Sequence, residues 1–524
     1  VTGVQTCALP ISSISDIILT GMAEKPDADM IIYGDEHITW SEMRDRSGQV
    51  ANALRADGVG PTDRIAYIDK NGPEYFELAF GCSFINAVTV AVNWRLAPPE
   101  MAYIVNDSKA AVLVIHEDLV EHLAAFEADL ESVRRIVVIG SHETHISYDE
   151  WRNAHPVESD VHDAQPDDVS MQLYTSGTTG MPKGAQLTNS NFNAAFNNVD
   201  WEMTGDARTM VMMPLFHIGG SGWAFFGMGS GATSILVREF DPVAGLQLIE
   251  SEQISHAFFV PAVLAFFSMV PSDGIDLSSM QTIAYGASPI TEDVLVNSMK
   301  MFGCEYSQVY GLTETTGVVT QLLPEDHDPG GPRQNLLRSA GKPIAGTEIH
   351  IIDPDTGDRL PDGEVGEVWI RSGQIMSGYW QMPEESAKAL PGDGWFRSGD
   401  AAYMEDGYLF IYDRVKDMII SGGENVYPAE IENALMGHEG VLDIAVIGVP
   451  DEKWGEVGKA LVIPVPDSGV TAEDILAFAR ERLAGFKCPR SVDFVEAIPR
   501  NPTGKILKRE LRDPFWEGHE RRVN

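Results

Sequence analysis

The sequence predicts an α/β protein with a large N-terminal domain of stacked sheets and flanking helices, a β subdomain, and a small mobile C-terminal α+β domain. The first observation is length, because 524 residues suffice for three or four domains of roughly 150 residues. The second is an alternation of short apolar runs with helix-length segments, which is typical of α/β proteins with buried strands. The third is composition, since 44% hydrophobic and 22% charged residues exclude global disorder.

Local signals place the elements of the N-terminal domain. Thr39 and Glu42 stand at capping-box spacing and predict an amphipathic helix over residues 39–58. The apolar runs predict strands. They are RIAYID (64–69), AAVLVIHED (110–118), RRIVVIG (134–140), HAFFVPA (256–262) and QTIAYGA (281–287). From about residue 345, EIHIIDPDTGD, GEVWIRSG and GYLFIYDR predict a mostly β subdomain that ends near Asp413 and Arg414.

A smaller unit follows. Its predicted order is helix (429–436), strand (443–449), strand (459–465), helix (471–483, with Thr471 and Asp474 as cap pair) and strand (491–495). The N-terminal sequence VTGVQTCALPIS has neither an initiator Met nor a basic segment, so it does not resemble a signal peptide. We therefore expect an unstructured or scar-like segment at 1–19, an N-terminal domain at 20–414, a hinge at 415–417 and a C-terminal domain at 418–524.

The charge is strongly negative. With 37 Lys and Arg against 78 Asp and Glu, the net charge of −41 opposes binding to nucleic acid or to an anionic membrane. Residues 480–512 are a local exception, with nine basic and four acidic side chains that suit small anionic ligands.

The uncharged stretch 209–237 contains six Gly and one Pro, so we expect a buried lining segment and no transmembrane segment.

Cysteine usage indicates the compartment. Cys7, Cys82, Cys304 and Cys488 are far apart in the sequence, with no metal-ligand spacing and no disulfide framework. A reducing, cytoplasmic location fits this pattern best. The sequence leaves the oligomeric state open, and a homodimer is one possible assembly.

The strongest local motif is YTSGTTGMPKG at residues 174–184. Glycines allow backbone N–H groups to approach an anion, hydroxyl groups add donors, and Lys183 adds a positive charge, so such a loop can hold phosphate. It is not a Walker A loop, because Pro182 and Gly184 flank the lysine where that pattern needs Gly and Ser or Thr. Taken alone, the motif fits an ordinary turn equally well.

Five further motifs follow in order. They are YGLTE (310–314), GD (399–400), YDRVKD (412–417), SGGENVYPAEIE (421–432) and PRNPTGKILKREL (499–511). Together with the first motif they resemble the adenylate-forming superfamily of acyl-CoA synthetases, luciferases and peptide-synthetase adenylation domains, over about residues 20 to 512. The resemblance implies ATP, Mg²⁺ and CoA as cofactors or co-substrates, and an acyl adenylate formed by an AMP-binding N-terminal domain.

The resemblance also implies a role for each motif in nucleotide binding. The β- and γ-phosphates would be held by Thr175, Ser176, Gly177, Thr178, Thr179 and Lys183. Adenine would be flanked by Gly286, Ala287, Ser288 and Tyr310. Asp400 would accept hydrogen bonds from both ribose hydroxyls, and Arg414 would add a second ribose contact. A buried structural salt bridge between Asp400 and an arginine is the competing interpretation.

Three residues would act on the reacting groups. Thr313 would contact the α-phosphate, and Glu314 would bind Mg²⁺, a hard cation that prefers oxygen ligands. Lys505 matches the lysine that bridges the substrate carboxylate and the α-phosphate, where a positioned ammonium offsets repulsion between two anions. The alternatives are a solvated loop carboxylate for Glu314 and a surface lysine for Lys505.

The second half-reaction requires thiol attack on the acyl adenylate, so the C-terminal domain must change its position between the two steps. Lys416 lies at the family's hinge position. In the thioester-forming state, Gly422, Gly423 and Glu424 would line the pantetheine tunnel.

The resemblance implies a small-molecule carboxylic acid as substrate. Related peptide-synthetase domains carry Asp in the segment that corresponds to PLFHIGG, whereas His217 here argues against an amino acid. The predicted acyl pocket contains His217, near the reacting carboxyl group, with Gly220, Trp223 and Gly311. A packed histidine and a buried helix fit the same residues.

We favour a medium- or long-chain fatty acid, with an aryl, steroid-side-chain or other bulky acid as the alternative. A luciferase-like oxygenase is less favoured, because the chain ends RRVN without the peroxisomal tripeptide. A noncatalytic nucleotide-binding relative is disfavoured because Lys183, Glu314, Asp400 and Lys505 are all present.

Overall fold

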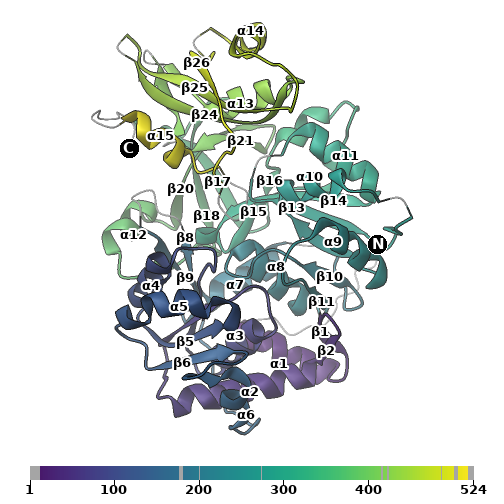
Figure 1. Ribbon diagram of the computed structural model, residues 1–524, viewed down its shortest axis with the longest axis vertical. Coiled ribbons are helices and arrows are strands. Elements are labelled where there is room, and N and C mark those ends of the chain that lie inside the picture. Colours follow the sequence, from purple (N-terminus) through teal and green to yellow (C-terminus); the bar gives the residue numbers. More distant parts are fainter. Residues whose placement is uncertain are drawn as a thin grey trace.

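The fold is taken from a computed structural model. It describes residues 12–175, 181–199, 201–272, 274–288, 290–414, 417–421, 424–451, 453–485, 487–500 and 506–516, and the side chains of 413–414, 420 and 424–425 are not among those described. These residues form four β-sheets with helices between and around them (Figure 1). The predicted α/β architecture of stacked sheets, a β subdomain and a smaller C-terminal α+β unit is confirmed.

The largest sheet of the described chain has nine strands and a parallel centre. Its order is β16 (Lys342–Pro343), β15 (Gly317–Leu322), β14 (Glu305–Leu312), β13 (Thr282–Gly286), β12 (His256–Phe259), β10 (Arg208–Val211), β11 (Thr233–Leu236), β1 (Asp29–Tyr33) and β2 (Glu36–Thr39). Strands β12, β13 and β14 run parallel, and β15 returns antiparallel to β14.

The second sheet of the described chain has eight strands and the same plan. Its order is β19 (Gly378–Tyr379), β9 (Lys183–Thr188), β8 (Val169–Thr175), β4 (Val88–Ala91), β3 (Arg64–Ile68), β5 (Ala110–His116), β6 (Arg135–Ile139) and β7 (Ile146–Ser147). Strands β3, β4 and β8 run parallel, and β9 returns antiparallel to β8. All five apolar runs predicted as strands are therefore strands of these two sheets.

Helices fill the space between and around the two large sheets. They are α1 (Ile14–Glu24), α2 (Trp40–Ala56), α3 (Glu74–Phe84), α4 (Pro98–Asp107), α5 (Val120–Phe126), α6 (Tyr148–Asn153), α7 (Asn189–Asn198), α8 (Ile218–Gly229), α9 (Pro242–Ser251), α10 (Pro261–Met269) and α11 (Glu292–Phe302). One large apolar core joins α1, α2, α3 and α8 to both sheets, and a second core packs α4 and α5 on the eight-stranded sheet. In the described chain, no helix combines the length and the apolar character needed to cross a bilayer.

Two N-terminal expectations have different outcomes. The helix predicted at residue 39 is present as α2, and Thr39 and Glu42 form its capping box. The expectation that 1–19 is unstructured is wrong for residues 14–19, which lie in α1. Ile14, Ile17 and Ile18 are buried there, because they repeat at helical spacing on the face that meets the core. Residues 1–11 lie outside the described part.

The predicted β subdomain is a four-stranded antiparallel sheet of β17 (Thr347–Ile352), β18 (Gly366–Ser372), β20 (Trp395–Glu405) and β21 (Tyr408–Arg414). Helix α12 (Pro383–Ala389) lies between β19 and β20 in the sequence. Because β19 pairs with β9, the segment before α12 attaches it to the edge of the eight-stranded sheet.

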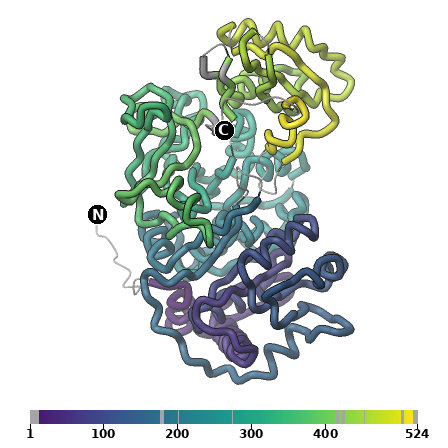
Figure 2. Tube along the Cα trace, turned by 90° about the vertical axis from the view of Figure 1, so that its left-hand side faces the viewer, coloured from purple at the N-terminus to yellow at the C-terminus, as the bar shows by residue number. Residues whose placement is uncertain are grey.

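The C-terminal unit has its own core. Its sheet contains β23 (Glu424–Val426), β22 (Ile419–Ser421), β25 (Gly455–Pro464), β24 (Val441–Asp451) and β26 (Ser491–Phe494), with helices α13 (Pro428–Met436), α14 (Ala472–Arg482) and α15 (Lys508–Trp516). The cap pair Thr471 and Asp474 forms the capping box of α14 as predicted. Figures 1 and 2 place this unit at one end of the molecule, next to β20 and β21. Strands β22 and β23 and helix α15 were not predicted.

Candidate active site

Thr175, Thr313 and Glu314, which are predicted to bind the phosphates and Mg²⁺, lie where parallel strands of the two large sheets end. Strand β8 ends at Thr175 and β14 ends at Leu312, and in each sheet the next strand turns back antiparallel. Ligands of open α/β sheets bind outside such carboxyl ends. The hydroxyl of Thr175 donates a hydrogen bond of 3.2 Å to Glu314 Oε1, so side chains from the two sheets meet directly.

A tight turn positions Thr313 and Glu314. They lie in a short 3₁₀ segment, η3 (Thr313–Thr315), between β14 and β15. The turn closes so tightly that a Cβ on Gly311 would lie 1.7 Å from the carbonyl oxygen of Gly317, so only glycine fits at position 311. The backbone of Met376 also donates to the carbonyl of Glu314 at 2.8 Å, which fixes this turn against the segment that leads to β19.

Glu314 is a buried carboxylate that is 8% exposed. Its Oε1 accepts hydrogen bonds from Thr175 and, at 2.9 Å, from the hydroxyl of Tyr379. Within the described residues, Oε2 takes part in no hydrogen bond with another side chain or backbone group. The surrounding structure therefore holds one oxygen in place and leaves the other for a further ligand, which contradicts a freely solvated loop carboxylate.

This geometry fits the Mg²⁺ that the family implies. Across the described segments, no three His, Cys, Asp or Glu side chains form a metal-binding cluster. Mg²⁺ is commonly bound through one or two carboxylates together with substrate phosphates and water, so a single anchored carboxylate suffices.

Lys183 is the first residue of β9 and is 8% exposed. Its ammonium forms an ion pair with Glu385 of α12 and lies 5.2 Å from the centre of the Tyr379 ring. The hydrogen bond from Lys183 lowers the pKa of Glu385 to about 2, and Lys388 acts in the same direction. The predicted phosphate-binding lysine is thus next to the residues around Glu314 and already has an anionic partner.

Tyr310 and Asp400 connect the nine-stranded and four-stranded sheets. The hydroxyl of Tyr310 donates to Asp400 Oδ2 at 2.8 Å, and Asp400 is 6% exposed. The backbone N–H of Asp400 donates to Ser398 Oγ at 3.0 Å. Arg414 lies opposite Asp400 in the β20–β21 register, although its side chain is outside the described part. Residues of three sheets therefore meet at this site.

The predicted adenine-binding segment follows β13, the strand next to β14. Gly286 is the last residue of β13, and a Cβ there would lie 2.2 Å from the carbonyl oxygen of Val309. Ala287 then has a positive φ of 68°, and Ser288 continues the chain. Close packing of the two backbones explains why glycine is required, and it places the three residues beside the strand that carries Tyr310.

His217 precedes α8 at the N-cap position. Its Nε2 is buried and has no hydrogen-bond partner among the described residues. Burial lowers the pKa of His217 to about 4, and the charge of Arg95 acts in the same direction. A buried nitrogen without a partner disagrees with the alternative of a hydrogen-bonded core histidine, and the role of His217 in an acyl pocket stays a prediction. The backbone N–H of Gly220 donates to the carbonyl of His217 at 2.9 Å, so both residues belong to the first turn of α8.

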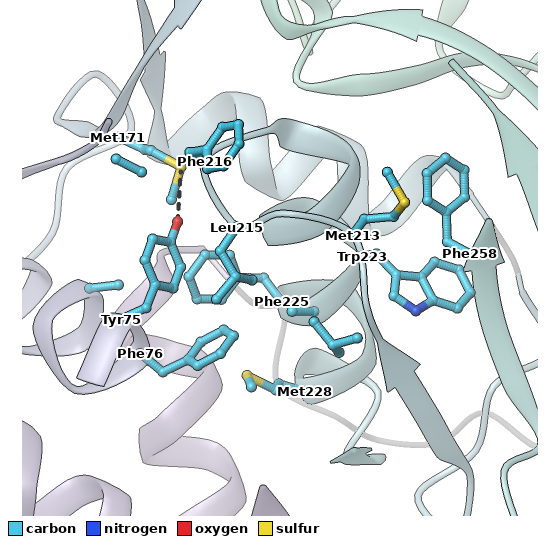
Figure 3. Packing of buried hydrophobic residues seen from close by; sticks show 14 of the residues in the cluster. Tyr75, Phe76, Met171, Met213, Leu215, Phe216, Trp223, Phe225, Met228 and Phe258 are labelled. Atoms are coloured by element: carbon cyan, nitrogen blue, oxygen red, sulfur yellow. Dashed lines mark hydrogen bonds between the residues drawn. The ribbon is translucent and has the colours of Figure 1, made fainter. Parts of the chain in front are cut away.

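Trp223 lies deeper in the same helix and belongs to the core. Its indole N–H donates to the carbonyl of Met210 at 3.2 Å, and its ring packs against Trp201 and Phe258, with ring centres 5.4 and 6.1 Å away. Figure 3 shows Trp223 beside Phe258 and Met213, in the same apolar cluster as Phe225. The structure thus favours the buried-helix interpretation for this residue, since its polar atom is already bonded.

Several predicted residues fall outside the described part. They are Ser176, Gly177, Thr178, Thr179, Lys416, Gly422, Gly423 and Lys505, together with the side chain of Glu424. The structure adds two residues that sequence reasoning missed, Tyr379 and Glu385. The local sequence around Tyr379, SGYW, carries no spacing that relates it to Glu314, because the contact is formed by the pairing of β19 with β9.

The basic stretch at 480–512 is less positive than its composition indicates. Lys487 pairs with Glu430, Arg500 with Asp443, Lys508 with Glu432 and Arg512 with Asp417. These acidic partners come from elsewhere in the C-terminal unit or from residue 417. Among the described residues of the stretch, Arg480 and Arg490 have no ion pair, so much of the positive charge serves internal structure.

Comparison with known proteins identifies the class. Residues 20–380 match the AMP-binding enzyme family, and residues 430–505 match the AMP-binding enzyme C-terminal domain. The chain therefore belongs to the AMP-binding enzyme family, the adenylate-forming superfamily that the motifs indicated. It is an ATP-dependent enzyme of the acid–thiol ligase class.

Individual relatives cover nearly the whole chain. A fatty acid–[acyl-carrier-protein] ligase of Streptomyces coeruleorubidus, ScoC, is 39% identical over 95% of this chain and 96% of its own length. A feruloyl-CoA synthase of an Amycolatopsis species is 40% identical over 94% and 96%. Among solved structures, the anthranilate CoA ligase AuaEII in complex with anthranoyl-AMP superposes with a TM-score of 0.87 at 26% identity, covering 96% of this chain and 97% of that one.

Proposed function

We propose that this protein is an acyl-CoA synthetase. It joins a carboxylic acid to ATP with release of pyrophosphate, and then transfers the acyl group to the thiol of CoA with release of AMP. The observation that carries the proposal is the Glu314 carboxylate, which is held through one oxygen by Thr175 and Tyr379 while Lys183 lies beside the Tyr379 ring. A fixed carboxylate, a buried ammonium and hydroxyl donors form a site suited to a metal–triphosphate.

We propose the nucleotide roles that the family resemblance implies, and the contacts of the described residues support them. Glu314 would hold Mg²⁺. When bound, this ion would neutralise the negative charge of the phosphates. Thr175 and Lys183, with Ser176, Gly177, Thr178 and Thr179, would hold the β- and γ-phosphates, and Thr313 the α-phosphate. Asp400 would accept hydrogen bonds from the ribose, and Tyr310 fixes its orientation through the 2.8 Å hydrogen bond. Gly286, Ala287 and Ser288 would flank adenine.

The reaction also needs a positive charge at the carboxylate, because two anions must approach each other. We assign this charge to Lys505. His217 cannot supply it, since its pKa of about 4 leaves it neutral at physiological pH. We propose further that residues 20–414 and 418–524 act as two domains about a hinge at 415–417. Rotation at Lys416 would replace Lys505 with Gly422, Gly423 and Glu424, which would line the thiol channel.

We propose a medium- or long-chain fatty acid as substrate. The neutral His217 leaves no anion for an amino group, and α8 is apolar around Trp223, Phe225 and Phe226. The similarity to a fatty acid ligase supports this choice. An aryl acid is the second candidate, because a feruloyl-CoA synthase is equally similar to this chain.

The three described cysteines are free, which supports a cytoplasmic location.

The test is release of AMP by the purified full chain with ATP and Mg²⁺, over acids from acetate to stearate with benzoate, ferulate, a steroid acid and amino acids. CoA and an acyl carrier protein serve as alternative thiols, and a Glu314→Gln variant controls for contaminating ligases. We expect CoA-dependent AMP release that is highest with fatty acids of medium or long chain. Activity with aryl acids alone would overturn the fatty-acid choice, and release with amino acids alone would overturn the interpretation of His217. Transfer to carrier protein alone would overturn CoA as the acceptor.

A further inference from the structure

The ion pair between Lys183 and Glu385 occupies the ammonium that would hold the β- and γ-phosphates. Lys183 is almost fully buried, whereas the Glu385 side chain is 25% exposed. A polyphosphate that binds Lys183 must compete with the Glu385 carboxylate, because both anions would pair with the same ammonium.

Strand pairing and hydrogen bonds of the backbone place Glu385 beside Lys183. Tyr379 pairs with Ala185 in the β19–β9 register, and the backbone of Trp380 donates to the carbonyl of Gly184 at 2.8 Å. The backbone of Tyr379 then donates to Ser386 Oγ at 2.9 Å, one residue beyond Glu385. These bonds attach the first turn of α12 to the start of β9, so that Glu385 lies next to Lys183.

Glu385 also has a second cation within reach. Lys388, one helical turn further along α12, donates to Glu385 Oε1 at 2.7 Å, whereas Lys183 contacts Oε2. The Lys388 side chain is 72% exposed and follows Glu385 by three residues on the same helix. The carboxylate is therefore shared between a buried lysine at the proposed phosphate site and an exposed lysine outside it.

We propose that Glu385 is a resident counter-ion of Lys183 that sets the affinity of the enzyme for polyphosphate. In the ligand-free enzyme it pairs with both Lys183 and Lys388. When the triphosphate of ATP binds Lys183, the carboxylate gives up Lys183 and keeps its pairing with Lys388, and it pairs with Lys183 again as pyrophosphate leaves. Glu385 is thus a positioning residue that weakens binding of ATP and pyrophosphate but not of AMP. This inference rests on the proposed function, because it takes Lys183 as the ligand of the β- and γ-phosphates.

The test is equilibrium binding, by titration calorimetry, of MgATP, magnesium pyrophosphate and AMP to the full chain. Wild type is compared with Glu385→Gln, which removes the charge with little change of shape. The matched control is Glu384→Gln, because Glu384 is the exposed neighbour on the same helix turn. We expect Glu385→Gln to bind ATP and pyrophosphate about two- to fivefold tighter, the range for a partly exposed ion pair, with AMP binding unchanged. Glu384→Gln should match wild type.

A second comparison tests the role of Lys388. If Lys388 acts by accepting Glu385, Lys388→Gln weakens ATP binding in the wild-type background and has no effect when Glu385→Gln is already present. In steady-state kinetics, Glu385→Gln should show a lower KM for ATP and stronger inhibition by pyrophosphate.

Other outcomes overturn the inference. Unchanged or weaker ATP binding by Glu385→Gln would mean that the carboxylate does not compete with phosphate. An equal gain in Glu384→Gln, or an equal gain for AMP, would mean that only the general charge of the surface matters. If wild type binds ATP and releases AMP normally while Glu385→Gln does not differ from it, the inference fails alone. Failure of wild type to bind ATP at all overturns the proposed function and the inference together.

Discussion

Tyr379 donates a 2.9 Å hydrogen bond to Glu314 Oε1, across 65 residues of sequence. The phenol comes from β19, the edge strand of the eight-stranded sheet beside β9. The carboxylate comes from the turn at the end of β14 in the nine-stranded sheet. Thr175 reaches the same oxygen from β8. Two neutral donors from one sheet thus fix an acidic side chain that belongs to the other, and its orientation depends on how the two sheets are packed.

Tyr379→Phe is expected to reduce adenylate formation by about tenfold or more, because a hydrogen bond to a charged group contributes about 1.5–3 kcal/mol. The loss should be largest at low Mg²⁺, since Glu314 would then be less well oriented for the metal. Pyrophosphate exchange at several Mg²⁺ concentrations measures this. Tyr408→Phe removes a comparable 3.0 Å phenol bond, made to Asp326 and to none of the predicted site residues, and it should leave the exchange rate unchanged. Equal rates in the two variants would contradict a role for Tyr379.

Tyr310→Phe is expected to weaken binding of AMP and ATP to the same extent, by about tenfold. The 2.8 Å bond to Asp400 orients the carboxylate that would receive the ribose hydroxyls, and both nucleotides share the ribose. Calorimetric titration of each nucleotide measures the effect, with pyrophosphate as the internal control because it lacks a ribose. A change in pyrophosphate binding of similar size would show that the substitution acts on the whole site.

The free energy of unfolding should depend on pH through His217. Its pKa is about 4 in the folded protein and about 6.5 when exposed, so the unfolded state binds more protons between these values. The contribution to stability is complete above about pH 6.5 and is lost as the pH falls toward 4, by as much as about 3 kcal/mol. Urea unfolding at pH 7 and pH 5 should therefore show a smaller loss for His217→Gln than for wild type. His37→Gln, at an exposed histidine, should behave like wild type.

Lys505→Ala is expected to abolish most adenylate formation and to spare thioester formation from a presynthesised acyl adenylate. The physical reason is that only the first step brings a carboxylate against the α-phosphate. Single-turnover assays of each half-reaction separate the two. Arg480→Ala, which removes a charge from the same basic stretch, should leave adenylation intact. Equal loss of both half-reactions in Lys505→Ala would contradict the assignment of Lys505 to adenylate formation.

Lys416→Pro is expected to have the opposite effect. A fixed φ at the hinge should allow the adenylating arrangement and block the rotation that admits the thiol. Acyl adenylate should then accumulate on the enzyme, and CoA should no longer speed AMP release. Unchanged overall turnover would refute this role for the hinge.

Local signals predicted much of the fold. The capping boxes at Thr39 and Thr471 fixed the starts of α2 and α14, because both depend only on residues three apart. Helix α1 was missed although Ile14, Ile17 and Ile18 stand at helical spacing, since the unusual residues before them suggested an unstructured segment. Helix α15 was missed because it is short, highly charged and contains Pro514, and it depends on contacts such as the 2.9 Å bond from Trp516 to Gly448.

The site was predictable only where one motif carries the chemistry. Lys183, Glu314 and Asp400 stand in recognisable motifs, and the structure brings them together. Tyr379 and Glu385 do not, because their positions are decided by the pairing of β19 with β9 and by the attachment of α12. Trp223 shows the converse limit. Its sequence fits a pocket wall and a core helix equally, and only the bond to the Met210 carbonyl favours the core.

The meeting of three sheets at one site links nucleotide binding to folding. A nucleotide held by Thr175, Tyr310 and Asp400 would bind only to molecules in which all three sheets are folded and docked. A ligand at 100 times its Kd then adds about 2.7 kcal/mol to the free energy of unfolding, and all three sheets share this gain. The four-stranded sheet, whose buried residues Ile349, Val368 and Leu409 belong to the large apolar core, could not unfold by itself without releasing the nucleotide. The substrate would thereby make the separate layers of the protein unfold as one cooperative unit.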